Sequence, residues 1–76
     1  MIKDDVVKII RRLLELNPYK VTVGVIGLAL NTSSNHKILA VRQALINLGV
    51  INRDKTFNRK KALEVLNNLV GGLELS

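Results

Sequence analysis

Apolar residues recur every three to four positions along much of this chain, which is the spacing that predicts amphipathic helices. The clearest case is the stretch 4–17, where Asp4 or Asp5 is expected to cap the helix and Asn17-Pro18 to end it. Its solvent-facing side is polar and consists of Lys8, Arg11, Arg12 and Glu15. Its predicted core-facing side consists of Val6, Ile9, Ile10, Leu13, Leu14 and Leu16.

Residues 19–30, YKVTVGVIGLAL, do not follow a single pattern. Their β-branched residues favour a strand, but apolar and polar positions do not alternate as they do in a half-buried strand. We predict a short extended segment at 19–21, an N-cap at Thr22 and a short buried helix over 23–30. Gly24 and Gly27 would allow that helix to pack closely against a neighbour.

The chain is organised around the stretch 33–51, which predicts one helix of about four turns. Ser33 or Ser34 is expected to cap its start, and Gly49 supplies the left-handed residue that ends it. One side of this helix carries the core positions Ile38, Val41, Leu45 and Leu48. The opposite side carries a set that we call the polar stripe: His36, Ala40, Gln43 and Asn47.

Two further apolar residues of this helix, Leu39 and Ile46, lie seven positions apart on a flank outside the core seam. We expect them to contact either the segment 52–58 or another subunit. The second possibility predicts a homodimer, held partly by these two residues or by the outer face of the first helix.

The segment 50–58 predicts a small hairpin with Arg53-Asp54-Lys55 as its turn, paired either with residues 19–21 or only with itself. Asn58 is expected to cap a last helix over 59–70, which Gly71-Gly72 ends. Residues 71–76 are then a flexible tail. The residues of this last helix that are predicted to face inward are Ala62, Leu63, Val65, Leu66, Leu69 and Val70.

The chain has 76 residues and no cysteine, so we expect one mainly α-helical domain over 1–76 with a minor β-hairpin and no disulfide. Its core spans about 4–70. No metal, cofactor or small-molecule substrate is expected, since the one histidine, His36, has no acidic pair near it. An enzyme is not expected either, because there is no cysteine nucleophile and no glycine-rich phosphate loop opening a helix.

Twelve basic residues against six acidic ones give a net charge of +6, which favours a polyanionic partner such as nucleic acid. Five of the nine residues 53–61 are basic and only Asp54 is acidic. Lys60 and Lys61 occupy the first turn of the last helix, where cations oppose the helix dipole and an arriving anion would relieve the conflict. A solvated run of charges is the alternative interpretation.

The order of elements resembles the winged helix-turn-helix family of DNA-binding domains, with three to four helices and a short wing. Thr22, Ile26 and Gly27 match the cap, apolar position and small residue of the family's second helix. The turn NTSSN is longer by about one residue than the commonest spacing in the family. The end of the recognition helix, where a leucine–glycine–apolar pair enters the wing, is matched by Val41, Leu45, Leu48, Gly49, Val50 and Ile51.

The resemblance implies that helix 34–48 enters the major groove of duplex DNA and that segment 53–61 touches the backbone. The base contacts then fall on the polar stripe, where Gln43 and Asn47 can pair with adenine and Ala40 can rest against a thymine methyl. The backbone contacts then fall on Ser33, Ser34, Asn35, Lys37, Arg53, Lys55, Arg59, Lys60 and Lys61.

Three functions remain open from the sequence. The first is a sequence-specific or architectural DNA-binding protein, most simply a transcription regulator. The second is an interaction module inside a replication, transcription or RNA-processing assembly, marked by Leu39 and Ile46 staying exposed. The third is RNA binding, which the scarcity of stacking aromatics disfavours, since only Tyr19 and Phe57 are present. No apolar run reaches about 20 residues and no secretory signal begins the chain, so a cytoplasmic, DNA-bound protein without a membrane partner is expected.

Overall fold

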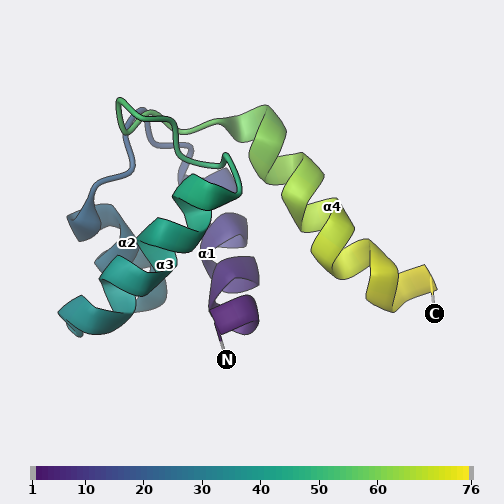
Figure 1. The fold of residues 1–76 in the computed structure, drawn as a ribbon, viewed down its shortest axis with the longest axis horizontal. Helices are drawn as coiled ribbons and strands as arrows, with labels where there is room; N and C mark the ends of the chain where they lie inside the picture. Colours follow the sequence, from purple (N-terminus) through teal and green to yellow (C-terminus); the bar gives the residue numbers. More distant parts are fainter. Residues whose placement is uncertain (1, 76) are drawn as a thin grey trace.

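The computed structural model describes the backbone of residues 2–75 and the side chains of residues 4–70. Over this part of the chain, four helices follow one another: α1 (Ile2–Leu16), α2 (Val23–Leu30), α3 (Asn35–Asn47) and α4 (Arg59–Leu75). Figure 1 shows α1, α2 and α3 as one group and α4 leaving it from the end where the connecting loops gather. The prediction of a mainly α-helical fold is confirmed.

Side-chain caps fix the starts of three helices. The hydroxyl oxygen of Thr22 accepts a hydrogen bond from the Val25 amide, and that of Ser34 accepts one from the Lys37 amide. Asn58 Oδ1 accepts a hydrogen bond of 3.0 Å from the Lys61 amide. Each bond satisfies an amide that has no partner inside its own helix. The predicted caps Thr22 and Asn58 are confirmed, and Ser34, not Ser33, caps α3.

The ends of α1, α2 and α3 use the left-handed conformation. Asn17 and Asn31 have φ angles of 48° and 53°, and Gly49 has φ of 82°. The amide of Val50 donates to Leu45 O over 2.9 Å, which together with Gly49 closes the end of α3 as a Schellman motif. The predicted stops at Asn17-Pro18 and Gly49 are confirmed.

Two predicted helix boundaries are wrong. The first helix begins at Ile2, so Asp4 and Asp5 lie in its first turn and do not cap it. Their negative charges interact favourably with the helix dipole there. The last helix continues past Gly71-Gly72 to Leu75, so the backbone of the predicted tail 71–75 is helical. Glycine costs a helix only about 1 kcal/mol per residue, so a glycine pair weakens a helix without ending it.

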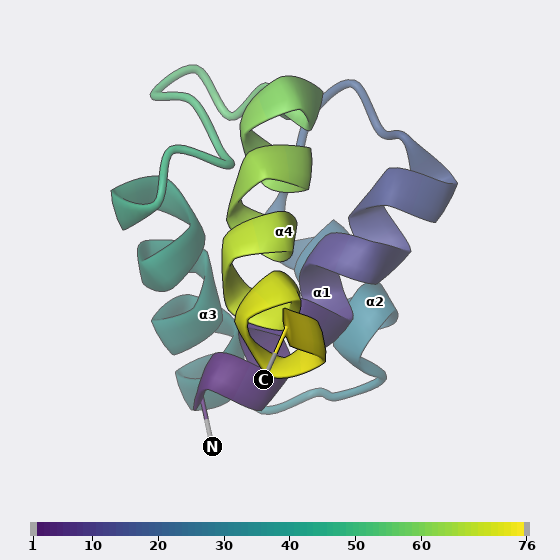
Figure 2. The same cartoon turned by 90° about the vertical axis from the view of Figure 1, so that its right-hand side faces the viewer.

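The core lies where α1 meets the other three helices, and in the turned view of Figure 2 α4 lies in front of α1, against which it packs. Most predicted inward-facing residues are buried or half-buried. The exceptions are Leu16 and Leu48, which stand at helix ends, and Leu63 on α4. The prediction that helix 23–30 is buried is wrong in part, because Val23 and Leu28 are exposed. The buried residues are Val6, Ile9, Ile10, Leu13, Val21, Ile26, Ala29, Leu30, Ile38, Val41, Leu45, Val50, Ile51, Ala62 and Val65.

Residues 51–57 fold back on themselves, but no strand forms anywhere in residues 2–75. Two isolated antiparallel bridges take the place of the predicted hairpin, Ile51↔Phe57 within the segment and Lys20↔Thr56 to the extended residues before α2. Both pairings considered from the sequence therefore occur, each over a single residue pair. The turn leaves too few residues on either side for a longer ladder. We call residues 51–57 the basic loop.

Candidate nucleic-acid interface

Helix α3 has one buried and one exposed side. Ile38, Val41 and Leu45 are buried against α1 and α2. The polar stripe on the opposite side is exposed at all four positions: His36, Ala40, Gln43 and Asn47. This separation places hydrogen-bonding side chains on a convex, accessible helix surface, which is the form that a major groove admits.

Two members of the polar stripe already contact each other. Gln43 Nε2 donates to Asn47 Oδ1 over 3.0 Å, one helical turn along. Each amide group keeps further donor or acceptor capacity, since an amide carries two N–H donors and an oxygen with two lone pairs. Bidentate pairing of either side chain with a base requires that this bond be broken or shared.

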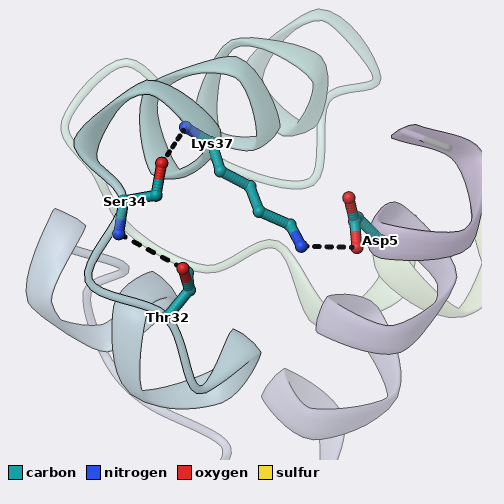
Figure 3. A network of polar contacts seen from close by, with 4 residues as sticks. All are labelled: Asp5, Thr32, Ser34 and Lys37. Carbon is teal, nitrogen blue, oxygen red and sulfur yellow. Dashed lines mark hydrogen bonds and ion pairs between the residues drawn. The ribbon is translucent and has the colours of Figure 1, made fainter.

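The start of α3 is held by a small polar network, shown in Figure 3. The Ser34 amide donates to the Thr32 hydroxyl, and the Ser34 hydroxyl caps the helix. Lys37 Nζ reaches Asp5 Oδ1 of α1 at 3.5 Å. Ser34 and Lys37 thus have internal partners, while Ser33 and Asn35 are exposed beside them.

The basic loop carries Arg53 and Lys55 at its exposed tip. The Lys55 amide donates to Asn52 O over 2.9 Å, and Lys55 O accepts from the Val21 amide over 2.7 Å. These two bonds hold Lys55 at φ of 72°, a left-handed conformation that non-glycine residues adopt uncommonly. The loop is therefore fastened to residues before α2 through a strained lysine.

Asp54 stabilises this turn. Its Oδ1 accepts hydrogen bonds from both the hydroxyl and the amide of Thr56. These bonds, the hydroxyl's first, favour the carboxylate and hold the pKa of Asp54 below its usual value. The one acidic residue of segment 53–61 thus has a structural role in the loop.

The basic residues at the start of α4 differ in their surroundings. Arg59 Nη1 donates to Leu14 O over 3.1 Å and lies 3.5 Å from Asn17 Oδ1. Lys61 pairs with Glu64 at 3.4 Å, and Lys60 is exposed. Of the predicted cations, Arg53, Lys55, Arg59 and Lys60 have no ion-pair partner among the side chains of residues 4–70, and Arg59 alone of these four donates hydrogen bonds to another element.

Six of the predicted backbone contacts form two groups, one at each end of α3, and the other three, Arg59, Lys60 and Lys61, lie at the start of α4. Ser33, Ser34, Asn35 and Lys37 lie at its start, and the basic loop follows its end. The 13 residues of α3 span about 20 Å at 1.5 Å per residue, and the polar stripe runs between the two groups. Cations and hydroxyls therefore flank the stripe on both sides, over a distance that exceeds the major-groove width of about 12 Å.

One basic residue near this surface was missed from the sequence. The Lys20↔Thr56 bridge brings Lys20 beside the basic loop, where its charge also acts on Asp54. The expected pairing of residues 19–21 with the hairpin already contained this information, because Lys20 is the middle residue of that segment. Arg42, half-buried on α3, is a second cation left out of the predicted set.

Other chemistry has no visible site in the described part of the chain. Among the side chains of residues 4–70, no three His, Cys, Asp or Glu residues lie close enough together to hold a metal ion. None of the helices over residues 2–75 has the length and apolar character needed to cross a membrane. Comparison with protein-family models, with curated proteins and with solved structures gave no match. The function is therefore inferred from the geometry and charge of the chain itself.

Proposed function

We propose that this protein binds duplex DNA with α3 in the major groove, as a sequence-specific or architectural protein that most simply regulates transcription in the cytoplasm. The observation that supports this best is the exposed polar stripe on α3 with basic or hydroxyl groups at both of its ends. A groove-reading helix needs base-reading side chains along one side and phosphate contacts where the helix leaves the groove. The net charge of +6 supports the same partner.

In this proposal the two groups of residues have different roles. Gln43 and Asn47 read base edges, and His36 reaches a phosphate or a base acceptor near the start of α3. Arg53, Lys55 and Lys60 contact phosphates, with Lys20 beside them. The winged helix-turn-helix arrangement is part of the proposal, supported by the two antiparallel bridges that join the basic loop to itself and to Lys20.

Fluorescence anisotropy with labelled duplex DNA tests the proposal at about 50 mM and about 200 mM salt. Each phosphate contact releases a counterion, so log affinity should fall linearly with log salt by about 0.9 per contact on B-DNA. Duplex RNA and single-stranded DNA of matched length are the controls. Binding that is absent at the lower salt, or that does not change with salt, would contradict the proposal.

A second candidate function, protein–protein interaction through α3, is favoured by one observation. Leu39 is 54% exposed beside the polar stripe, although Ile46 is half-buried and packs against the core. A homodimer joined at Leu39 would present two copies of α3 to DNA and double the number of base pairs read. Light scattering on the free protein and on its DNA complex tests this, and a monomer in both would contradict it.

A further inference from the structure

Helix α2 has no polar side chain, yet part of its surface faces solvent. Its sequence is VGVIGLAL, and only Ile26, Ala29 and Leu30 are buried. Leu28 is 80% exposed and Val23 49% exposed. A helix that is apolar on every side is typical of a fully buried element, so the exposed side of α2 is unexplained by the fold alone. We call Val23, Gly24 and Leu28 the α2 face.

Nothing else in the described chain covers this face. Helix α2 packs against α1 and α3 but not against α4, and Figure 1 shows α4 on the far side of the three-helix group. Open grooves border α2 on both sides, one shared with the start of α3 and one shared with α1, and Leu28 lines both.

The two glycines of α2 differ in what they contact. A Cβ at Gly27 would come within 3.2 Å of Ile38 Cδ1 and of Thr32 O, so internal packing explains this glycine. A Cβ at Gly24 would meet only Thr22 Oγ1, at an ordinary 3.7 Å. Alanine would therefore fit at Gly24 and favour the helix. The glycine leaves the α2 face flat, so another chain can approach the backbone closely.

The groove between α1 and α2 supplies charge beside this apolar surface. Lys8, Arg11 and Arg12 line it together with Leu28. Glu15 also lines it but pairs with Arg12 at 3.1 Å. A second copy of this chain would bring two basic rims together and is disfavoured, whereas a partner with carboxylates beside its apolar residues is complementary.

We propose that the α2 face docks an acidic amphipathic helical segment of a partner protein. Apolar side chains of that segment lie on Val23 and Leu28, its backbone crosses close to Gly24, and its carboxylates pair with Lys8 and Arg11. This is the helix-in-groove mode, in which anchors at i, i+3, i+4 and i+7 give affinity and flanking charges select the partner. The α2 face lies outside the polar stripe, and the inference does not rest on DNA binding. The groove between α2 and the start of α3 is nevertheless lined in part by Ser33 and Asn35 of the proposed interface.

The probe is a synthetic helical peptide of about 14 residues, with leucine at i, i+3, i+4 and i+7 and glutamate on its other side. A scrambled peptide of the same composition is its control, and calorimetry on the full chain measures binding. We expect the helical peptide to bind. Leu28→Gln should weaken its affinity about tenfold and leave the thermal stability of the protein unchanged. Leu63→Gln, which removes an exposed leucine from α4, should leave the affinity unchanged.

Two further variants separate docking from folding. Gly24→Ala should weaken the affinity for the peptide while keeping or raising the melting temperature of the protein. A purely structural role for Gly24 would not produce this combination. Arg11→Glu should weaken the affinity for the peptide and reduce the dependence of that affinity on salt. The proposal would be overturned if the scrambled peptide bound as tightly as the helical one, or if Leu63→Gln lost as much affinity as Leu28→Gln.

Other occupants of the α2 face would give different results. If vesicles of phosphatidylcholine and phosphatidylglycerol bind the wild type but not Leu28→Gln, and the peptide does not bind, the α2 face contacts a membrane surface. Sedimentation that shows Leu28-dependent self-association would assign it to a second copy. Loss of duplex DNA affinity in Leu28→Gln would place it in the DNA interface. Each of these three results would overturn the docking of an acidic segment.

Discussion

The guanidinium of Arg59 donates from Nη1 to the carbonyl oxygen of Leu14 over 3.1 Å, which joins the start of α4 to the end of α1 across 45 positions of sequence. The carbonyl groups in the last turn of a helix have no partner inside the helix and carry its negative dipole end. A cation placed there is stabilised by both effects. The charge of Arg59 therefore interacts unfavourably with the dipole of its own helix, α4, but favourably with the dipole of α1.

This contact predicts that Arg59 matters more for stability than for DNA affinity. Arg59→Ala should lower the free energy of unfolding by about 0.5–1.5 kcal/mol, since it removes a hydrogen bond to an otherwise unpaired carbonyl. Lys60→Ala, the matched control at an exposed neighbouring cation, should change it by less than about 0.5 kcal/mol. Urea unfolding measures both. If the two variants are equally stable, the contact with Leu14 contributes nothing.

The strained conformation of Lys55 predicts opposite effects on stability and binding. Lys55→Gly should raise the free energy of unfolding by about 0.5–1 kcal/mol, because glycine adopts φ of 72° without steric cost. It should also remove one phosphate contact and reduce the salt slope of DNA binding by roughly one unit. Lys55→Ala is the control, with the same loss of charge and no relief of strain. A loss of stability in Lys55→Gly would mean that the side chain itself holds the loop.

Asp54 predicts a pH dependence of the basic loop. Its pKa in the folded protein lies below that of the unfolded chain, so its contribution to stability is present above about pH 3.9 and is lost as the pH falls through the folded value. The stability difference between wild type and Asp54→Asn should therefore shrink on acidification below that pH. Urea titrations of both proteins at neutral and acidic pH measure this. A difference that stays constant across the range would contradict the prediction.

The helices could be predicted from the sequence because local features mark them. Thr22 and Asn58 are side-chain caps, and Gly49 is a left-handed stop. The boundaries that were missed, at Ile2 and Leu75, lie where no such feature stands. Leu16 and Leu48 follow the helical spacing but stand at helix ends, where the core no longer reaches them.

The site was less accessible to sequence reasoning because its electrostatics depend on contacts between distant residues. The exposed stripe on α3 follows from helical spacing alone. The pairing of Lys37 with Asp5 and of Arg59 with Leu14 joins elements far apart in the chain, and no local pattern predicts either. The same holds for Lys20, which lies beside the basic loop only because the chain returns to it.

The hydrogen bond between Gln43 and Asn47 leads to the most specific prediction about base reading. If α3 lies in the major groove, Gln43→Ala should keep the fold and non-specific affinity but cost about 1–3 kcal/mol at the preferred site. If the bond is kept in the complex, Gln43 orients Asn47, so Gln43→Ala already impairs the contact made by Asn47 and the double variant with Asn47→Ala should cost less than the sum of the single ones. The preferred site comes from selection on random duplexes, and anisotropy gives the ratio of specific to non-specific affinity. A ratio unchanged in both single variants would show that this helix does not read sequence.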